Sequence, residues 1–145
     1  MLMLFFIASL VPAMAQSAGD KIVGTYQVVR NKVNSKVKVT KNSNGTYKAQ
    51  VIWADNVIKK DGSILYDEKN PDKSKRNVRA DQIVLIDALT YDEKDNEWAG
   101  GKIYDPTKGK HYTVKCSFDG DKKLKLRGYI GVPALGETMY WTKIQ

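Results

Sequence analysis

Residues 98–112 read Trp-Ala-Gly-Gly-Lys-Ile-Tyr-Asp-Pro-Thr-Lys-Gly-Lys-His-Tyr, which is the pattern of two β-strands joined by a tight turn. Pro106 presets φ for the first corner of a turn, and Gly109 can adopt the positive φ that closes one. Aromatic and β-branched residues flank the turn on both sides, as is typical of strands. This stretch therefore predicts a β-hairpin.

Alternation of apolar and polar residues continues on both sides of this hairpin, without a sustained helical stripe after the N-terminal segment. Asn44-Gly45 marks an earlier hairpin turn. The strand after that turn is expected to place four side chains on one face: Tyr47, Ala49, Val51 and Trp53. Residues 82–91 and 97–104 predict another hairpin around a polar tip, and residues 137–144 predict the closing strand.

Counted from residues 24–30, about eight strands follow one another, the spacing of an up-and-down antiparallel barrel or of a sandwich. The exception is the polar segment 67–80, which is longer than a usual hairpin loop and is expected to be functional or flexible. Asp67, Asn70, Asp72 and Arg76 gather there and could line an entrance. Local turns in a solvated loop would explain these four residues as well.

The N-terminus carries the pattern of an export signal. Residues 2–14 are apolar, and Ala13-Met14-Ala15 is a small-x-small cleavage pattern before Gln16. We therefore expect a signal peptide over residues 1–15 and a single domain over residues 16–145, with a buried N-terminal helix as the alternative. The apolar run is shorter than the roughly 20 residues that span a bilayer, so no transmembrane anchor is expected.

Cys116 is the sole cysteine, so the exported domain has no internal disulfide. That combination favours a bacterial periplasm or secreted fluid over an animal extracellular space. The formal net charge of +8 favours anionic partners such as a carboxylate ligand or an anionic envelope surface. A solvated, lysine-rich outer surface is the alternative. Nucleic-acid binding is not expected, because no recognised binding motif accompanies the charge.

Catalytic and metal-binding patterns are weak in this chain, so we do not expect an enzyme or a cofactor. His111 and Cys116 lie five positions apart in one expected strand, on opposite faces and roughly 17 Å apart at about 3.4 Å per residue. A single histidine makes a zinc site improbable. The carboxylates of residues 92–97 lack the spacing of a calcium loop and are expected to be a solvated turn.

Aromatic residues carry the stronger functional signal. Eight tyrosines and three tryptophans follow residue 15, but only one phenylalanine, so nearly every aromatic ring brings a polar tip. Such side chains suit a partly wet cavity inside an eight-stranded barrel. The candidate lining residues are Trp53, Tyr104, Tyr129 and Trp141, and the alternative is that they simply pack the core. Arg127 is a fifth candidate, to stack on an aromatic ring or to pair with Asp105 or a ligand carboxylate.

Three segments carry a resemblance to a known family. They are Asp67-x-x-Asn70-Pro71-Asp72, the long motif from Trp98 to Tyr112, and Leu124-x-Leu126-Arg127-Gly128-Tyr129-x-Gly131. Together they resemble the exported bacterial proteins of domain of unknown function family 2147. The resemblance implies a lipocalin-like (calycin-like) barrel that carries a small molecule. In lipocalin-like chains an N-terminal Gly-x-Trp and a C-terminal basic residue pack together at the barrel base; here Tyr26 and Lys143 stand at those positions.

The sequence thus predicts an exported protein that holds a small, partly apolar or acidic ligand in its barrel. The alternative is a packed barrel that docks through its surface to an anionic envelope polymer or to a protein partner.

Overall fold

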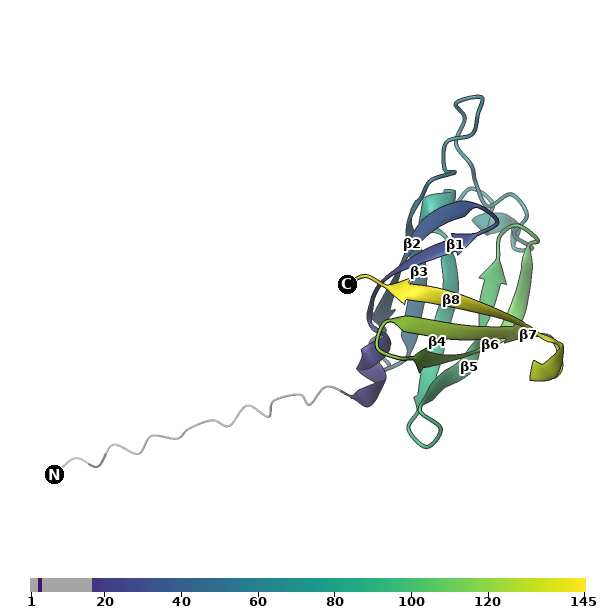
Figure 1. The fold of residues 1–145 in the computed structure, drawn as a ribbon. Coiled ribbons are helices and arrows are strands. Elements are labelled where there is room, and N and C mark those ends of the chain that lie inside the picture. Colours follow the sequence, from purple (N-terminus) through teal and green to yellow (C-terminus); the bar gives the residue numbers. More distant parts are fainter. Residues whose placement is uncertain (1–2, 4–16) are drawn as a thin grey trace.

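The computed structural model describes residue 3 and residues 17–145. The predicted signal peptide, residues 1–15, lies outside the described residues except for Met3. Eight strands form the described fold: β1 (Gly24–Arg30), β2 (Val33–Lys41), β3 (Tyr47–Ala54), β4 (Val84–Asp92), β5 (Glu97–Asp105), β6 (Lys110–Asp119), β7 (Lys123–Tyr129) and β8 (Glu137–Lys143). Each strand pairs antiparallel with the next, and β8 pairs with β1 to close a barrel (Figure 1). The predicted up-and-down barrel is confirmed.

Four short 3₁₀ helices accompany the strands: η1 (Ala18–Ile22), η2 (Lys73–Lys75), η3 (Ala80–Gln82) and η4 (Pro133–Leu135). Within the described part of the chain, no helix has the length and apolar character needed to cross a membrane.

One end of the barrel is closed by η1. The Trp98 indole donates to the Gly19 carbonyl at 3.0 Å, and the Tyr26 hydroxyl donates to the Ile22 carbonyl at 2.7 Å. Ile22 is buried, and the Lys143 ammonium donates to the Lys21 carbonyl at 2.6 Å. Buried tyrosine and tryptophan side chains need hydrogen-bond partners, and here the carbonyls of η1 supply them for Trp98 and Tyr26. These bonds hold η1 against the end of the barrel.

The contact expected between Tyr26 and Lys143 at this base is not the one that forms. The two residues are cross-strand partners, but the Lys143 ammonium lies over the Phe118 ring, 5.9 Å from its centroid. The Tyr26 ring instead meets Trp141, with centroids 6.1 Å apart. Cross-strand aromatic packing and the helix η1 together close the base.

A β-bulge changes which residues of β3 face the interior. Lys36 pairs with Trp53, but Val37 pairs with Val51, so Ile52 is skipped. An extra residue reverses the alternation beyond the bulge. Ala54 is therefore buried, whereas Trp53 is 45% exposed and lies under the ammonium of Lys36 on the outer surface. The expectation that Trp53 shares the inward face of β3 was wrong for this reason.

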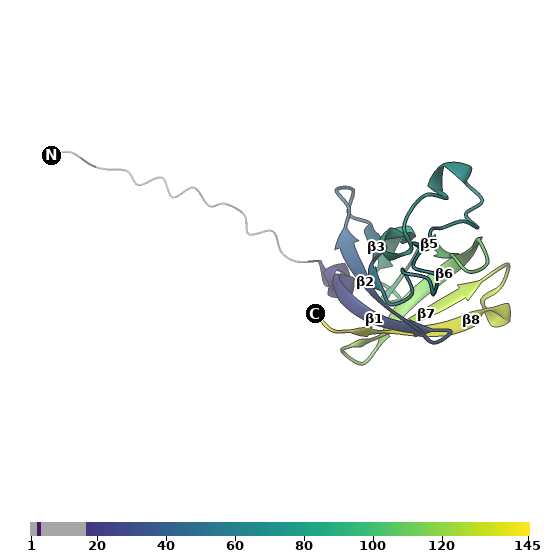
Figure 2. The same ribbon diagram turned by 90° about the horizontal axis from the view of Figure 1, so that it is seen from above.

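The opposite end of the barrel is the mouth. It is formed by the β1–β2 turn, the β5–β6 turn, the β7–β8 loop and residues 55–83, which we call the mouth segment. The mouth segment contains η2 and η3 and extends beyond the barrel at the end away from η1 (Figure 1). Figure 2 shows it from above, next to the ends of β5 and β6. It encloses the predicted loop 67–80.

Candidate ligand cavity

A cavity of about 400 Å³ opens at the mouth and extends into the barrel. Its volume lies in the range typical of small-molecule sites. Most of its wall is apolar and comes from several strands and the mouth segment. The apolar lining residues are Val28, Val33, Val51, Ala54, Leu65, Ala80, Ile83, Leu85, Ile103, Met139 and Trp141.

Trp141 forms the floor of this cavity. It is buried and also borders the packed half of the interior, near Leu124 and Leu126. On that side, toward η1, the side chains leave no room for a water molecule. The barrel is therefore solid near η1 and hollow near the mouth, because the large rings of Tyr26, Trp98 and Trp141 lie in the half near η1.

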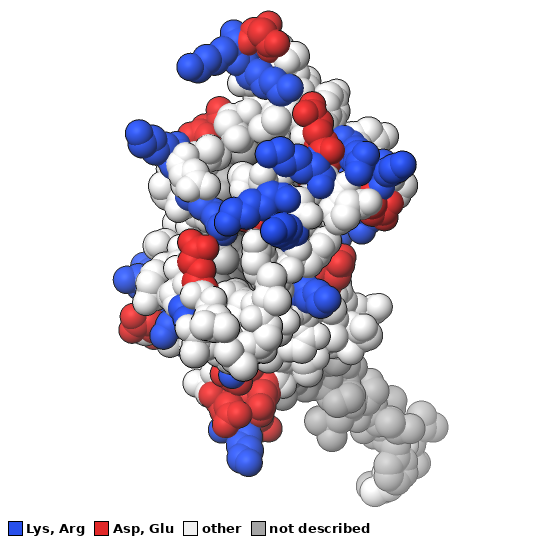
Figure 3. Space-filling model, turned by 90° about the vertical axis from the view of Figure 1, so that its right-hand side faces the viewer, with Lys and Arg blue, Asp and Glu red and all other residues white. Residues whose placement is uncertain are grey.

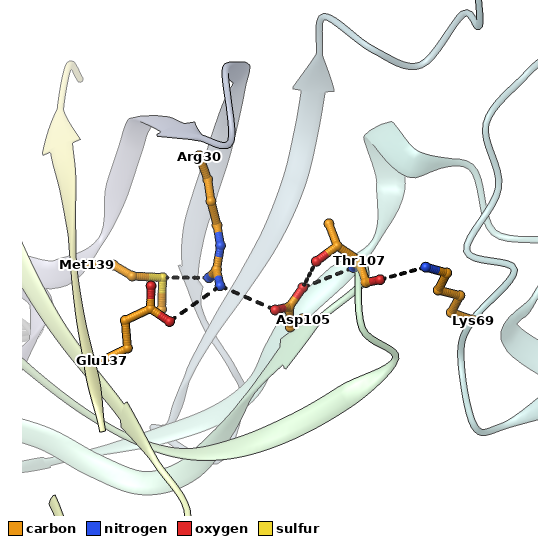
Figure 4. A network of polar contacts seen from close by, with 6 residues as sticks. All are labelled: Arg30, Lys69, Asp105, Thr107, Glu137 and Met139. Carbon is orange, nitrogen blue, oxygen red and sulfur yellow. Dashed lines mark hydrogen bonds and ion pairs between the residues drawn. The ribbon is translucent and has the colours of Figure 1, made fainter. Parts of the chain in front are cut away.

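An ion pair lies at the polar edge of the cavity (Figure 4). Arg30 Nη2 lies 3.2 Å from Asp105 Oδ2 and 3.8 Å from Glu137 Oε2. The other oxygen of Asp105 accepts hydrogen bonds from the backbone N–H and the hydroxyl of Thr107, at 2.9 and 2.6 Å. Asp105 is 5% exposed and Arg30 is 35% exposed, so the carboxylate is fixed while the guanidinium still faces the opening.

Arg30 keeps donor capacity in this arrangement. Its Nη1 donates to the thioether sulfur of Met139 at 3.0 Å, and a thioether is only a weak acceptor. A guanidinium carries five N–H donors, and Asp105 accepts a hydrogen bond from one of them. Arg30 lines both the main cavity and a neighbouring pocket of about 240 Å³ near the β7–β8 loop. Arg30 therefore borders both spaces with N–H groups that neither Asp105 nor Met139 accepts.

Tyr104 fastens the mouth segment to the barrel. Its hydroxyl donates to Asp67 Oδ1 at 2.6 Å, and Asn70 Nδ2 donates to the other Asp67 oxygen at 2.8 Å. Arg76 in turn donates to the Asn70 carbonyl at 2.8 Å. Burial raises the pKa of the Tyr104 hydroxyl, and the bond to Asp67 raises it further, so the hydroxyl stays a donor. Three of the four polar residues singled out in the loop thus build a clamp at the entrance.

The structure brings together only part of the predicted site. Trp141 and Tyr104 border the main cavity, and Tyr129 borders the smaller neighbouring pocket. The Tyr104 ring lies beside the exposed His111, with ring centroids 4.8 Å apart, and its hydroxyl bonds to Asp67 of the mouth segment. Trp53 lies outside the cavity.

Arg127 also lies outside the cavity, and of the contacts considered for it the pairing with Asp105 does not form. It bonds to the carbonyls of Pro133 and Ala134 and to the Thr138 hydroxyl. Asp105 pairs with Arg30 instead. Tyr26, Val28 and Arg30 lie two positions apart, so the alternation of β1 already places an arginine in phase with an inward tyrosine. That signal could have identified Arg30 from the sequence.

Three other groups that the sequence raised as catalytic or metal-binding candidates do not line the cavity. Cys116 is buried on the inward face of β6, and burial raises the pKa of its thiol to about 12. His111 on the same strand is exposed. Asp92, Asp95 and Glu97 place carboxylate oxygens within 4.8 Å of one another at the β4–β5 turn, where the two aspartates are exposed.

Comparisons with known proteins agree with this architecture. The fold is similar to a solved structure described as protein HP1028 from the human pathogen Helicobacter pylori, which belongs to the lipocalin family. The TM-score is 0.65 at 26% identity, over 85% of this chain and 82% of that one. No protein with a curated description matches the chain. The family described as "uncharacterized protein conserved in bacteria" (DUF2147) matches residues 24–143, and this chain, with its lipocalin-like barrel, belongs to it.

Proposed function

We propose that this protein is an exported carrier that holds one small, partly apolar molecule in the barrel cavity. The observation that carries the proposal is the hollow half of the barrel, an apolar chamber of about 400 Å³ that opens beside the Arg30–Asp105 pair. Apolar surface that a ligand buries there contributes roughly 25 cal/mol per Å². The chamber provides affinity, and the polar edge orients the ligand.

The polar end of the ligand is proposed to meet Arg30. Because Asp105 and Glu137 already lie near the guanidinium, an acidic ligand gains from Arg30 but is repelled by these carboxylates. A neutral acceptor, such as a carbonyl or hydroxyl oxygen, gains a hydrogen bond without that repulsion. Comparing a fatty acid with its alcohol of equal length separates an acidic preference from a simple acceptor preference.

A lipocalin-like fold supports small-molecule binding in general, since barrels of this size hold one small ligand. We propose binding rather than catalysis, because Cys116 is buried with a raised pKa and His111 is exposed on the far face of its strand. Export to the periplasm or to secreted fluid is proposed from the apolar run and cleavage pattern of residues 2–15. Sequencing the N-terminus of the exported protein should give Gln16.

Two substitutions on one strand test the cavity. Ala54 lines it, whereas the outward Ile52 lies two positions earlier and is exposed. We expect Ala54→Trp to weaken binding of the uncharged apolar fluorophore N-phenyl-1-naphthylamine at least tenfold, and Ile52→Trp to leave it unchanged. Circular dichroism and melting temperature establish whether both variants are folded. If Ala54→Trp does not fold, Val28→Phe is the substitute, because Val28 lines the same cavity from β1.

Two measurements on wild-type protein can contradict the carrier proposal. Wild-type protein that binds no apolar probe, and that yields no bound molecule in a native mass spectrum, is not a carrier. Binding that falls steeply from low to physiological ionic strength would instead support docking of an anionic envelope polymer on the surface lysines. Burial of an apolar ligand responds little to salt.

A further inference from the structure

The β7–β8 loop exposes three large apolar side chains beside the mouth. Residues 130–136 read Ile-Gly-Val-Pro-Ala-Leu-Gly, without a charged residue, and we call them the apolar lip. Ile130 is 65% exposed, Val132 53% and Leu135 80%. Single exposed apolar residues are ordinary, but three within six positions form a patch that calls for an explanation.

The apolar lip is held in a defined shape. Arg127 donates from Nε to the Pro133 carbonyl at 2.9 Å and from Nη1 to the Thr138 hydroxyl at 2.8 Å. Within the lip, Leu135 N donates to the Val132 carbonyl and Gly136 N to the Pro133 carbonyl, each at 3.1 Å. These bonds order a loop whose apolar side chains remain in solvent, so the ordering buries little apolar surface. A surface role accounts for the arrangement better than core packing does.

The apolar lip adjoins the ligand cavity. Ile130 and Leu135 line the neighbouring pocket of about 240 Å³, together with Tyr112 and Tyr129. That pocket shares five residues with the main cavity: Arg30, Ile103, Tyr104, Asp105 and Met139. A molecule that moves from the lip into the barrel therefore passes from one pocket to the next along residues that line both.

We propose that the apolar lip docks the mouth on an anionic membrane surface, with its side chains inserted at the level of the lipid headgroups. Basic groups accompany the apolar ones: Lys108 lines the pocket that the lip borders, Arg127 bonds to the lip backbone, and the whole chain carries +8. The carboxylates of that pocket, Asp105 and Glu137, lie against Arg30. Figure 3 views the side of the molecule that bears the β7–β8 loop and shows Lys and Arg, with Asp and Glu between them, across the half of the molecule nearer the mouth. Apolar insertion together with attraction to acidic headgroups is sufficient for reversible membrane binding.

A lipid surface fits the size of the patch better than a protein partner does. A stable protein interface buries about 800 Å² on each partner, which is far more than three side chains supply. Membrane docking needs no complementary shape, and a lip next to the cavity lets a partly apolar ligand leave the bilayer without crossing water. The lip thus identifies the surface from which the proposed carrier is loaded.

The test is sedimentation of the protein with vesicles, using phosphatidylcholine alone and phosphatidylcholine mixed with phosphatidylglycerol. We expect binding to the mixed vesicles, weakened by salt, and little binding to the neutral ones. Ile130→Ser combined with Leu135→Ser should reduce the partition coefficient by at least tenfold, since each removes an inserted aliphatic side chain. Ile144→Ser is the matched control, because Ile144 is 43% exposed and bonds to Thr25 at the η1 end of the barrel, opposite the mouth, and it should bind like wild type.

A second measurement locates the contact. Because Cys116 is buried, the thiol of Leu135→Cys can be labelled selectively with an environment-sensitive fluorophore. Its emission should shift to the blue on mixed vesicles, whereas the same label on Ile144→Cys, at the η1 end of the barrel, should not respond. The proposal is wrong if wild-type protein ignores both vesicle types, or if the lip and control variants bind alike.

Two further outcomes separate the possible causes of a failure. If the lip variants instead abolish self-association or capture of a protein partner, the lip is a protein contact and membrane docking is refuted. The cavity-filled variant Ala54→Trp should still bind vesicles. A failed ligand-binding experiment therefore counts against the carrier proposal alone, and a failed vesicle-binding experiment counts against the docking proposal alone.

Discussion

Replacing Tyr104 by phenylalanine removes one hydroxyl from the clamp between β5 and the mouth segment. The hydroxyl donates at 2.6 Å to Asp67, a carboxylate that is 3% exposed. Without it, the side-chain donor that remains to Asp67 in the described contacts is Asn70, at 2.8 Å. The ring itself still fills its place beside His111, so the change isolates the hydrogen bond from the packing.

The expected cost is about 1–3 kcal/mol, because a buried charged acceptor loses one of its donors and cannot readily recover it from water. That is a large fraction of the roughly 5–15 kcal/mol by which a domain of this kind is stable. Tyr91→Phe is the matched control. Its hydroxyl donates to Asn96 at 2.8 Å in an exposed position, where water replaces the lost partner, so we expect about 0.5 kcal/mol or less.

Urea unfolding gives the global free energy, and amide hydrogen exchange reports opening of the mouth segment. We expect Tyr104→Phe to lower the unfolding free energy and to speed exchange at the amides of Asp67 and Ala80, which donate to the Val78 and Leu65 carbonyls. Equal unfolding free energies for the Tyr104 and Tyr91 variants, with unchanged exchange in residues 65–80, would refute the clamp.

Three other predictions follow from single side chains. The ion pair with Lys41 lowers the pKa of Asp20 below its ordinary 3.8, so its contribution is complete above that pH and is lost as the pH falls through the lowered value. Asp20→Asn should therefore flatten the fall of the urea midpoint below pH 3.8, and a curve parallel to wild type would count against this. Cys116 should resist thiol reagents in native protein and react at once in urea; rapid native labelling would contradict its burial. Gly109→Ala should cost about 1–3 kcal/mol by urea unfolding, since φ is +64° and a Cβ there would collide with the Lys69 carbonyl of the mouth segment. Gly120→Ala, with comparable φ but open space, should cost less.

The limits of sequence reasoning are clearest at Trp53 and Arg127. Strict alternation places Trp53 with Val51, but one bulge in β3 turns it outward and brings Ala54 inside. A bulge depends on how two strands meet, so a single strand's pattern does not reveal it. For Arg127 the sequence left open stacking on an aromatic ring, pairing with Asp105 and pairing with a ligand carboxylate. The side chain instead orders the neighbouring loop, and Asp105 pairs with Arg30, 75 residues away along the chain.

The sequence by itself determined the number, order and hairpin turns of the strands and the family, because period-two alternation and turn residues are local properties of the chain. Only the tertiary structure decided that the barrel is packed at one end and hollow at the other. That difference depends on how far Trp98, Trp141 and η1 fill a volume enclosed by all eight strands. The cavity is enclosed by all the strands together, so no single segment of the sequence predicts its volume. In the same way, Arg30 of β1 and Asp105 of β5 come together at its edge only when the barrel closes.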